Sequence, residues 1–217
     1  NLYNYILEQS KNFSQEALNR HAATMRMRGR PKVVLARTYE EAQKLYDKYS
    51  DNTLGVISDA RFPLKSAAKA FGNEVMPEEK PKHRTDTFGR EKCPDAGLQL
   101  FRYIRKNDPF VPLIIESSES ENRAKAEAEG FRFVDKNSKK MSVDLRRLME
   151  EHMGFGDFIF RDPKTHEEIM RIHSLKELQD NIFNIPNDSM LYHISRNHMS
   201  RWLCARAIFP VSAFLKH

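Results

Sequence analysis

The chain has 217 residues, 40% of them hydrophobic and 30% charged, which is enough apolar content for one large domain or one domain with an appendage. Lys and Arg outnumber Asp and Glu by 36 to 30, but the basic residues are spread among the acidic ones, which argues against nucleic-acid binding. No apolar run approaches the ~20 residues of a membrane span. The two cysteines, Cys93 and Cys204, lie far apart, which fits a reducing cytoplasm better than a disulfide framework or a zinc site.

The start of the chain gives a second expectation. The first residue is Asn1 rather than Met, and residues 1–30 lack the apolar stretch of a signal peptide. We therefore expect a cytoplasmic segment of a longer protein.

The first predicted elements alternate between helix and strand. Apolar residues recur at helical spacing over 2–29, and a Lys-Val-Val-Leu-Ala run at 32–36 is typical of a strand. Thr38, with a glutamate three residues later, predicts a capping box at the start of a helix over 39–49. The short apolar run at 54–59 predicts a buried strand.

Residues 64–93 lack apolar periodicity and are rich in Lys, Glu, His and Pro. Long loops without structure of their own are uncommon in compact domains and are either functional or disordered. His83 and Cys93 are the soft metal ligands in this stretch, too few for a metal site. We expect a solvated, mobile insertion.

Regular elements resume at Asp95, which is expected to cap a helix that ends at Asn107. Further expected elements are a strand at 111–117, a helix at 120–129, a strand at 131–136 and a helix at 142–152. This alternation indicates βαβ units and predicts an α/β fold with a mainly parallel, doubly wound sheet that has helices on both faces.

The pattern changes after Gly154. A strand and turn follow, then two helices at about 174–184 and 188–206, the first with a capping box at Ser174 and the second capped by Asp188. We interpret Trp202 as a core or interface residue. The predicted domains are 1–153, an α/β domain, and 154–217, a small and mainly helical linker module.

Polar side chains follow three of the expected strands. Asp59 ends the first, Ser117 the second, and Lys136 the third. Because ligands of open α/β sheets bind beyond the carboxyl ends of the strands, we expect these side chains to share one site. An acid, a hydroxyl and an ammonium group suit a phosphoryl group and a divalent metal.

Residues 32–152 resemble a response-regulator receiver domain, a flavodoxin-like fold of signal transduction and phosphorelays. The resemblance rests on Val-Ile-Ser-Asp59-Ala-Arg-Phe-Pro63, Pro94-Asp-Ala-Gly97-Leu-Gln-Leu-Phe, Pro112-Leu-Ile-Ile-Glu-Ser117-Ser118 and Gly130-Phe-Arg-Phe133-Val-Asp-Lys136.

The resemblance implies a role for each site residue. Asp59 would be the phosphoacceptor, and Ser117 and Lys136 would contact the phosphoryl group. Phe133 would be a switching aromatic, and Arg61 would offer its backbone carbonyl to Mg²⁺ beside Asp59. A phosphodonor such as a histidine kinase would be the partner.

Three features depart from the receiver pattern. The acidic pair that holds the metal is absent from this sequence, the insertion at 64–93 directly follows the acceptor strand, and Glu116 places a charge late in a core strand. They leave open a phosphorylation-independent pseudo-receiver that serves as a docking or dimerisation module. In that reading Asp59 caps a loop and Phe133 is ordinary core.

The second part of the chain has a resemblance of its own. Gly154-Phe-Gly-Asp-Phe158 and Ser195-Arg-Asn-His-Met-Ser-Arg-Trp-Leu203 resemble the N-terminal region of bacterial phosphoenolpyruvate synthase or pyruvate phosphate dikinase-like proteins. This implies a parent ATP-dependent phosphotransferase whose kinase chemistry and ATP site lie in downstream domains, with the present chain as a non-catalytic regulatory part.

Two further alternatives stay open for this part. Its helices could contact the parent's nucleotide, and His193 could carry a phosphoryl group, although a buried helix histidine with its hydrogen bonds satisfied is the commoner case.

Overall fold

The computed structural model describes residues 2–15, 20–64 and 91–217, and the chain groups into two compact units. We call Val34–Met141 the central unit, and Asn1–Val33 together with Ser142–His217 the flanking unit. The domains expected from sequence, 1–153 and 154–217, stay a prediction. In the described parts of the chain, none of the helices has the length and apolarity that crossing a membrane requires.

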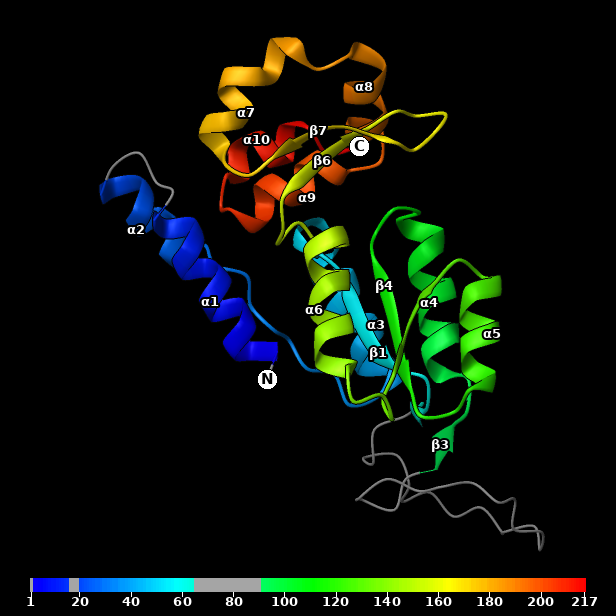
Figure 1. Ribbon diagram of the computed structural model, residues 1–217. Helices are drawn as coiled ribbons and strands as arrows, with labels where there is room; N and C mark the ends of the chain where they lie inside the picture. Colours follow the sequence, from blue (N-terminus) through cyan, green and yellow to red (C-terminus); the bar gives the residue numbers. More distant parts are fainter. Residues whose placement is uncertain (1, 16–19, 65–90) are drawn as a thin grey trace, which may run out of the picture. The chain divides into compact units, whose positions relative to one another are not determined.

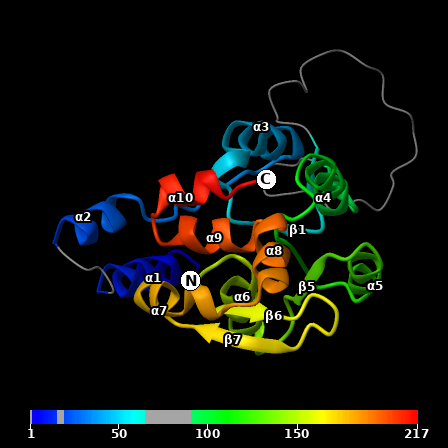
Figure 2. The ribbon, with the colours of Figure 1, turned by 90° about the horizontal axis from the view of Figure 1, so that it is seen from above.

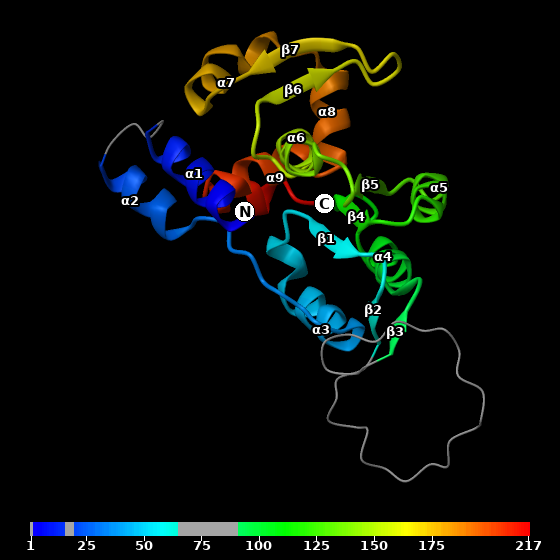
Figure 3. The ribbon, with the colours of Figure 1, turned by 60° about the horizontal axis from the view of Figure 1, so that its bottom comes forward.

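The central unit contains a parallel sheet of three strands. These are β1 (Val56–Asp59), β4 (Leu113–Ser117) and β5 (Arg132–Asp135), in the order β1-β4-β5 (Figure 3). Their register pairs Asp59 with Glu116 and Ser117 with Asp135, so the three carboxyl ends meet at one edge. The predicted mixed α/β class and parallel strands are confirmed.

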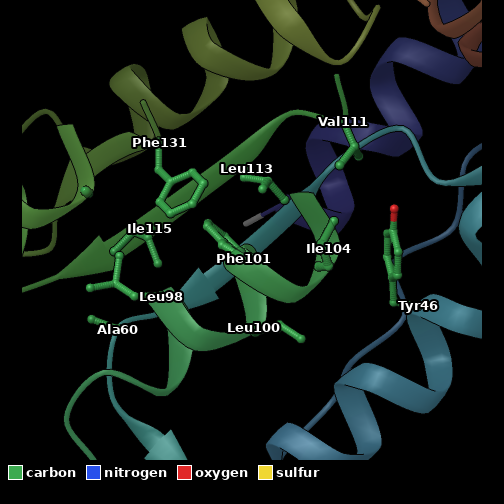
Figure 4. Packing of buried hydrophobic residues seen from close by; sticks show 11 residues of the cluster. Tyr46, Ala60, Leu98, Leu100, Phe101, Ile104, Val111, Leu113, Ile115 and Phe131 are labelled. Carbon is green, nitrogen blue, oxygen red and sulfur yellow. The ribbon is translucent and has the colours of Figure 1, made fainter. Parts of the chain in front are cut away.

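Three helices pack on one face of this sheet: α3 (Tyr39–Tyr49), α4 (Ala96–Asn107) and α5 (Glu121–Ala128). Alternate residues of a strand point to the same face, and Leu113 and Ile115 of β4 share a buried cluster with side chains from all three helices (Figure 4). Phe101 of α4 meets Phe131 edge-on, with ring centroids 5.4 Å apart. These contacts fix the helices against the sheet.

Local signals explain where these helices begin and end. Thr38 Oγ1 accepts the Glu41 N–H at 3.2 Å, which confirms the predicted cap of α3. Gly130, at φ +72°, follows α5 in the left-handed conformation that glycine adopts freely. Asp95 occupies the predicted N-cap position of α4, but its side chain makes no capping bond, and its carboxylate pairs with Lys125 at 3.1 Å instead.

One further prediction concerns an edge of the central unit's sheet. The strand at 32–36 is wrong: residues 30–36 have no regular structure, and Val34 and Leu35 are 58% and 71% exposed. A strand needs a neighbour to pair with, and no described strand pairs with the second edge of β1. A short 3₁₀ helix, η1 (Ser50–Asn52), leads into β1.

The insertion is bracketed by a short antiparallel pair, β2 (Phe62–Pro63) and β3 (Lys92–Cys93). Residues 65–90, including His83, lie outside the described residues. The predicted mobility of the insertion therefore stays a prediction.

The flanking unit begins with two helices, α1 (Leu2–Gln15) and α2 (Arg20–Arg28), so the prediction of one helix over 2–29 is wrong. Arg26 donates to the Phe13 carbonyl at 2.8 Å. A continuous helix would separate these residues by ~20 Å. Helices α1 and α2 are therefore not parts of one continuous helix.

The rest of the flanking unit combines helices with one hairpin. Helix α6 (Met141–His152) begins at the unit boundary. Strands β6 (Phe158–Arg161) and β7 (Glu168–Ile172) pair antiparallel (Figure 2), so this part is less purely helical than predicted. The remaining elements are α7 (Leu175–Asn181), η3 (Ile182–Asn184), α8 (Asn187–Ser195), α9 (His198–Ala205) and α10 (Phe209–Phe214).

The predicted helix over 188–206 is two helices, α8 and α9. Asn197 separates them with φ +57°, a left-handed conformation that asparagine tolerates better than most residues. The predicted cap at Asp188 is wrong, because Asp188 lies in the first turn of α8 and Pro186 is the N-cap residue. The capping box at Ser174 is confirmed, because its hydroxyl accepts the Glu177 N–H at 3.2 Å.

A buried arginine anchors the core of the flanking unit. The Arg206 guanidinium donates to the carbonyls of Gly154 at 2.7 Å and Gly156 at 3.1 Å. It also stacks over the rings of Trp202 and Phe13, at 3.8 and 4.3 Å from their centroids. Trp202 is 1% exposed, so its prediction as a core residue is confirmed.

Two histidines of this unit form a buried pair. His193 Nε2 accepts the Arg161 N–H at 3.0 Å, and its Nδ1 lies 3.0 Å from His198 Nδ1. Burial, with nearby arginines, lowers the pKa of His193 to about 4 and that of His198 to about 3. With 4% of its surface exposed, His193 is a satisfied core histidine rather than an accessible nucleophile.

Candidate functional site

The candidate site lies at the carboxyl edge of the central unit's sheet, where Figure 1 shows β1 and β4 side by side. Asp59 ends β1, and 45% of its side chain is exposed. Lys136 directly follows β5 and reaches Asp59 across the edge, with Nζ 2.6 Å from Oδ2. Two of the three predicted site residues are thus in direct contact.

The main chain after Asp59 is held in place by its neighbours. The Ala60 N–H donates to the Glu116 carbonyl, and the Ala60 carbonyl accepts the Gly97 N–H, both at 3.0 Å. A Cβ on Gly97 would lie 2.4 Å from the Asp59 carbonyl oxygen. Glycine at this position therefore lets the first turn of α4 approach the acidic residue.

Ser117 ends β4 on the neighbouring strand and is 5% exposed. Its Oγ accepts from Asn122 Nδ2 at 2.9 Å and from the Glu119 N–H at 3.1 Å. Both donors come from the loop and first turn after β4. The hydroxyl proton is left to donate, since both hydrogen bonds use oxygen lone pairs.

Arg61 has two contacts at the site. Its N–H donates to Asp59 Oδ1 at 3.3 Å, and its guanidinium Nη2 lies 3.1 Å from both carboxylate oxygens of Glu119. This ion pair joins the loop after β1 to the loop after β4. The resemblance assigned a role to the Arg61 carbonyl alone, and the contact of its side chain was not predicted from sequence.

A second carboxylate stands beside Asp59. Glu116 is its register partner on β4, so the two side chains leave the sheet on the same face. Burial raises the pKa of Glu116, the Lys136 charge opposes this shift, and the Asp59 charge adds to it. The charge noted in sequence as a departure is thus part of the site's electrostatics.

Phe133 lies on β5, half-buried against the cluster beneath α3, α4 and α5. The guanidinium of Arg123 stands 4.7 Å from its ring centroid. Phe133 is thus a packed side chain with the guanidinium of Arg123 over its ring. The switching role of Phe133 stays a prediction.

The donor atoms around Asp59 do not by themselves form a magnesium site. Within the described ranges, no group of three or more His, Cys, Asp or Glu side chains could hold a metal ion. Both Asp59 oxygens already accept hydrogen bonds, one from Lys136 and one from the Arg61 N–H. Mg²⁺ binds through one or two carboxylates and several waters, so a metal here would compete with Lys136.

Comparisons with protein-family models, curated proteins and solved structures give no match for this chain.

Two residues of the site were not found from sequence: Glu119 and Asn122. Glu119 and Asn122 follow Ser117 by two and five residues, which places them in the loop and the first turn of α5. Their contacts with Arg61 and Ser117 depend on how the loops meet in space. A search limited to strand ends passes over them.

The arrangement offers an accessible carboxylate with an ammonium group on one oxygen, and a serine and a guanidinium near by. A carboxylate of this kind can bind a cation or accept an electrophilic group such as a phosphoryl group. Lys136 offsets the negative charge that otherwise repels a phosphate, which is the electrostatic requirement of phosphoryl transfer.

Proposed function

We propose that the central unit is a receiver-like regulatory module that accepts a phosphoryl group on Asp59. The observation that carries the proposal is the contact between Lys136 Nζ and the exposed carboxylate of Asp59, at the edge where three parallel strands end. We also propose that the central unit has the flavodoxin-like, doubly wound arrangement of receivers.

The proposed step is a transfer from a small acyl phosphate or a phosphohistidine donor. One Asp59 oxygen attacks phosphorus, a P–O bond forms, and the bond from phosphorus to the donor oxygen or nitrogen breaks. With acetyl phosphate the products are an aspartyl phosphate and acetate, so no proton or electron is left over. Lys136 moves from the carboxylate to a phosphoryl oxygen, and the Ser117 hydroxyl can donate to another.

The wider assignment follows the resemblance. We propose that the chain regulates a phosphoenolpyruvate synthase or pyruvate phosphate dikinase-like enzyme, with ATP bound in downstream domains of the parent. Magnesium dependence through Asp59 and the Arg61 carbonyl also stays a prediction. The described donor set does not support it alone, and no step above requires it.

The test is intact mass spectrometry of the chain after incubation with acetyl phosphate, with and without Mg²⁺. We expect a gain of one phosphoryl group in the wild type and none in Asp59→Asn. Asp95→Asn is the matched control, because Asp95 is also an exposed aspartate paired with a lysine, at 3.1 Å. It should be phosphorylated like the wild type.

A second candidate function is a phosphorylation-independent docking or dimerisation module. The observation in its favour is that both Asp59 oxygens are already occupied by Lys136 and Arg61. Light scattering of the wild type and of Asp59→Asn distinguishes the two. A dimer that forms equally in both, together with no gain of mass, supports the docking module.

A further inference from the structure

The Arg61–Glu119 pair beside Asp59 has an unused binding capacity. The Arg61 guanidinium contacts the Glu119 carboxylate through one nitrogen, Nη2, at 3.1 Å. The Nε of Arg61 is buried and has no hydrogen-bond partner among the residues that the structure describes. A guanidinium with an unsatisfied buried donor is suited to a second anion, and its planar fork fits phosphate oxygens.

Glu119 in turn organises the loop that leads into α5. Its N–H donates to Ser117 Oγ at 3.1 Å, and its Oε2 accepts from Asn122 Nδ2 at 3.3 Å. Asn122 is 4% exposed, and its N–H donates to the Glu119 carbonyl at 3.2 Å. Arg61 therefore holds a residue that the start of α5 depends on.

A phosphoryl group on Asp59 would form next to this pair. Arg61 is two residues from Asp59, and its own N–H already donates to the Asp59 carboxylate at 3.3 Å. Phosphorylation adds a charge of about −1.5 to −2 and three acceptor oxygens. The competing carboxylate of Glu119 carries one charge and is 40% exposed, so water screens its pairing with Arg61.

We propose that Arg61 is an exchange switch: it pairs with Glu119 before phosphorylation and moves to the phosphoryl group on Asp59 afterwards, which releases Glu119 and loosens residues 118–122. This inference rests on the proposed function. It identifies the start of α5 as the segment that responds to phosphorylation. It also identifies the Arg61 side chain as a group that binds the phosphoryl group.

The test is amide hydrogen exchange over residues 118–126, measured by mass spectrometry with and without acetyl phosphate. In the phosphorylated wild type we expect exchange to rise roughly two- to fivefold, the range that loss of an exposed ion pair allows. Arg61→Met should exchange fast from the start, and phosphorylation should add nothing.

Arg102→Met is the matched control, because Arg102 forms an ion pair with Glu129, at 2.6 Å, at the other end of α5. Its exchange over 118–126 should still rise on phosphorylation. Glu119→Gln provides a second route: with Arg61 intact, the loop should exchange fast without any phosphoryl group.

The outcomes separate the two proposals. No gain of mass in the wild type overturns the proposed function, and the switch with it. A gain of mass without faster exchange over 118–126, or with a rise that Arg61→Met leaves unchanged, overturns the switch alone. If Arg61→Met is not phosphorylated, slow exchange in unphosphorylated Glu119→Gln overturns the switch instead.

Discussion

Gly97→Ala tests the close approach that positions Asp59. Gly97 lies in the first turn of α4, and an added Cβ would stand 2.4 Å from the Asp59 carbonyl oxygen, 3.0 Å from Ile115 Cδ1 and 3.1 Å from Ala60 Cα. Two of these atoms belong to the main chain. The main chain must therefore shift to accommodate the added Cβ, because the closest contact is with a backbone atom rather than with a flexible side chain.

Two effects of opposite sign compete at this position. Alanine is the better helix former and by itself would stabilise α4 by about 0.5–1 kcal/mol. Overpacking against fixed neighbours costs about 1–3 kcal/mol. Since the closest contact is with backbone, we expect the steric cost to prevail and the central unit to lose about 1–2 kcal/mol of unfolding free energy.

The assay is hydrogen exchange of peptides that cover β1 and β4, since the sole tryptophan lies in the flanking unit. A loss of 1.4 kcal/mol corresponds to about tenfold faster exchange of the most protected amides. Gly130→Ala is a useful comparison, because nothing lies within 4 Å of its added Cβ and its cost comes from φ +72° alone. Slower exchange in Gly97→Ala would refute the packing argument.

The remaining predictions concern stability. Burial keeps His193 and His198 neutral in the folded chain, with pKa values lowered to about 4 and about 3, so stability should be full above pH ~6.5 and fall as the pH drops toward 4. Urea unfolding of the wild type and of His193→Gln at pH 5 and pH 7 checks this prediction. It would be contradicted if the unfolding midpoint were the same at the two pH values in both proteins. Arg206→Met removes charged donors from buried carbonyls and should cost about 2–4 kcal/mol, followed by the fluorescence of Trp202 in urea. A midpoint equal to that of the wild type would rule out this anchor. Thr38→Ala removes a helix cap and should cost the central unit about 1 kcal/mol, measured as faster hydrogen exchange of peptides that cover β1 and β4, whereas unchanged exchange would show that solvent replaces the cap.

Much of the central unit follows from local pattern. Short apolar runs bounded by turn residues predict β1, β4 and β5, and a threonine with a glutamate three residues later predicts α3. The parallel arrangement follows from the alternation of strands and helices. Because parallel strands end at the same edge, sequence order alone places Asp59 and Lys136 close together.

The errors arise where structure depends on distant neighbours. Residues 32–36 have strand composition but no partner strand in the described chain, and composition does not form a strand without pairing. The break at Asn197 has a left-handed φ of +57° inside an otherwise periodic helical pattern, so periodicity passes over it. The division of residues 2–28 into α1 and α2 was hidden by apolar residues that continue at helical spacing along both helices.

The site shows the same division. The strand-end residues can be predicted from sequence because the carboxyl ends of parallel strands meet at one edge of the sheet. The Arg61–Glu119 pair, in contrast, joins residues 58 apart in sequence. No spacing rule connects these two positions. Contacts between loops of this kind are set by the way the loops meet, and they become visible in the folded chain.

The most direct test of the central claim is to locate the phosphoryl group. After incubation with acetyl phosphate, borohydride reduces an aspartyl phosphate to homoserine and releases phosphate, and peptide sequencing by mass spectrometry then identifies the residue. We predict homoserine at position 59 and an unmodified Asp95. Homoserine elsewhere, or none in the folded chain, would contradict the assignment of Asp59 as phosphoacceptor.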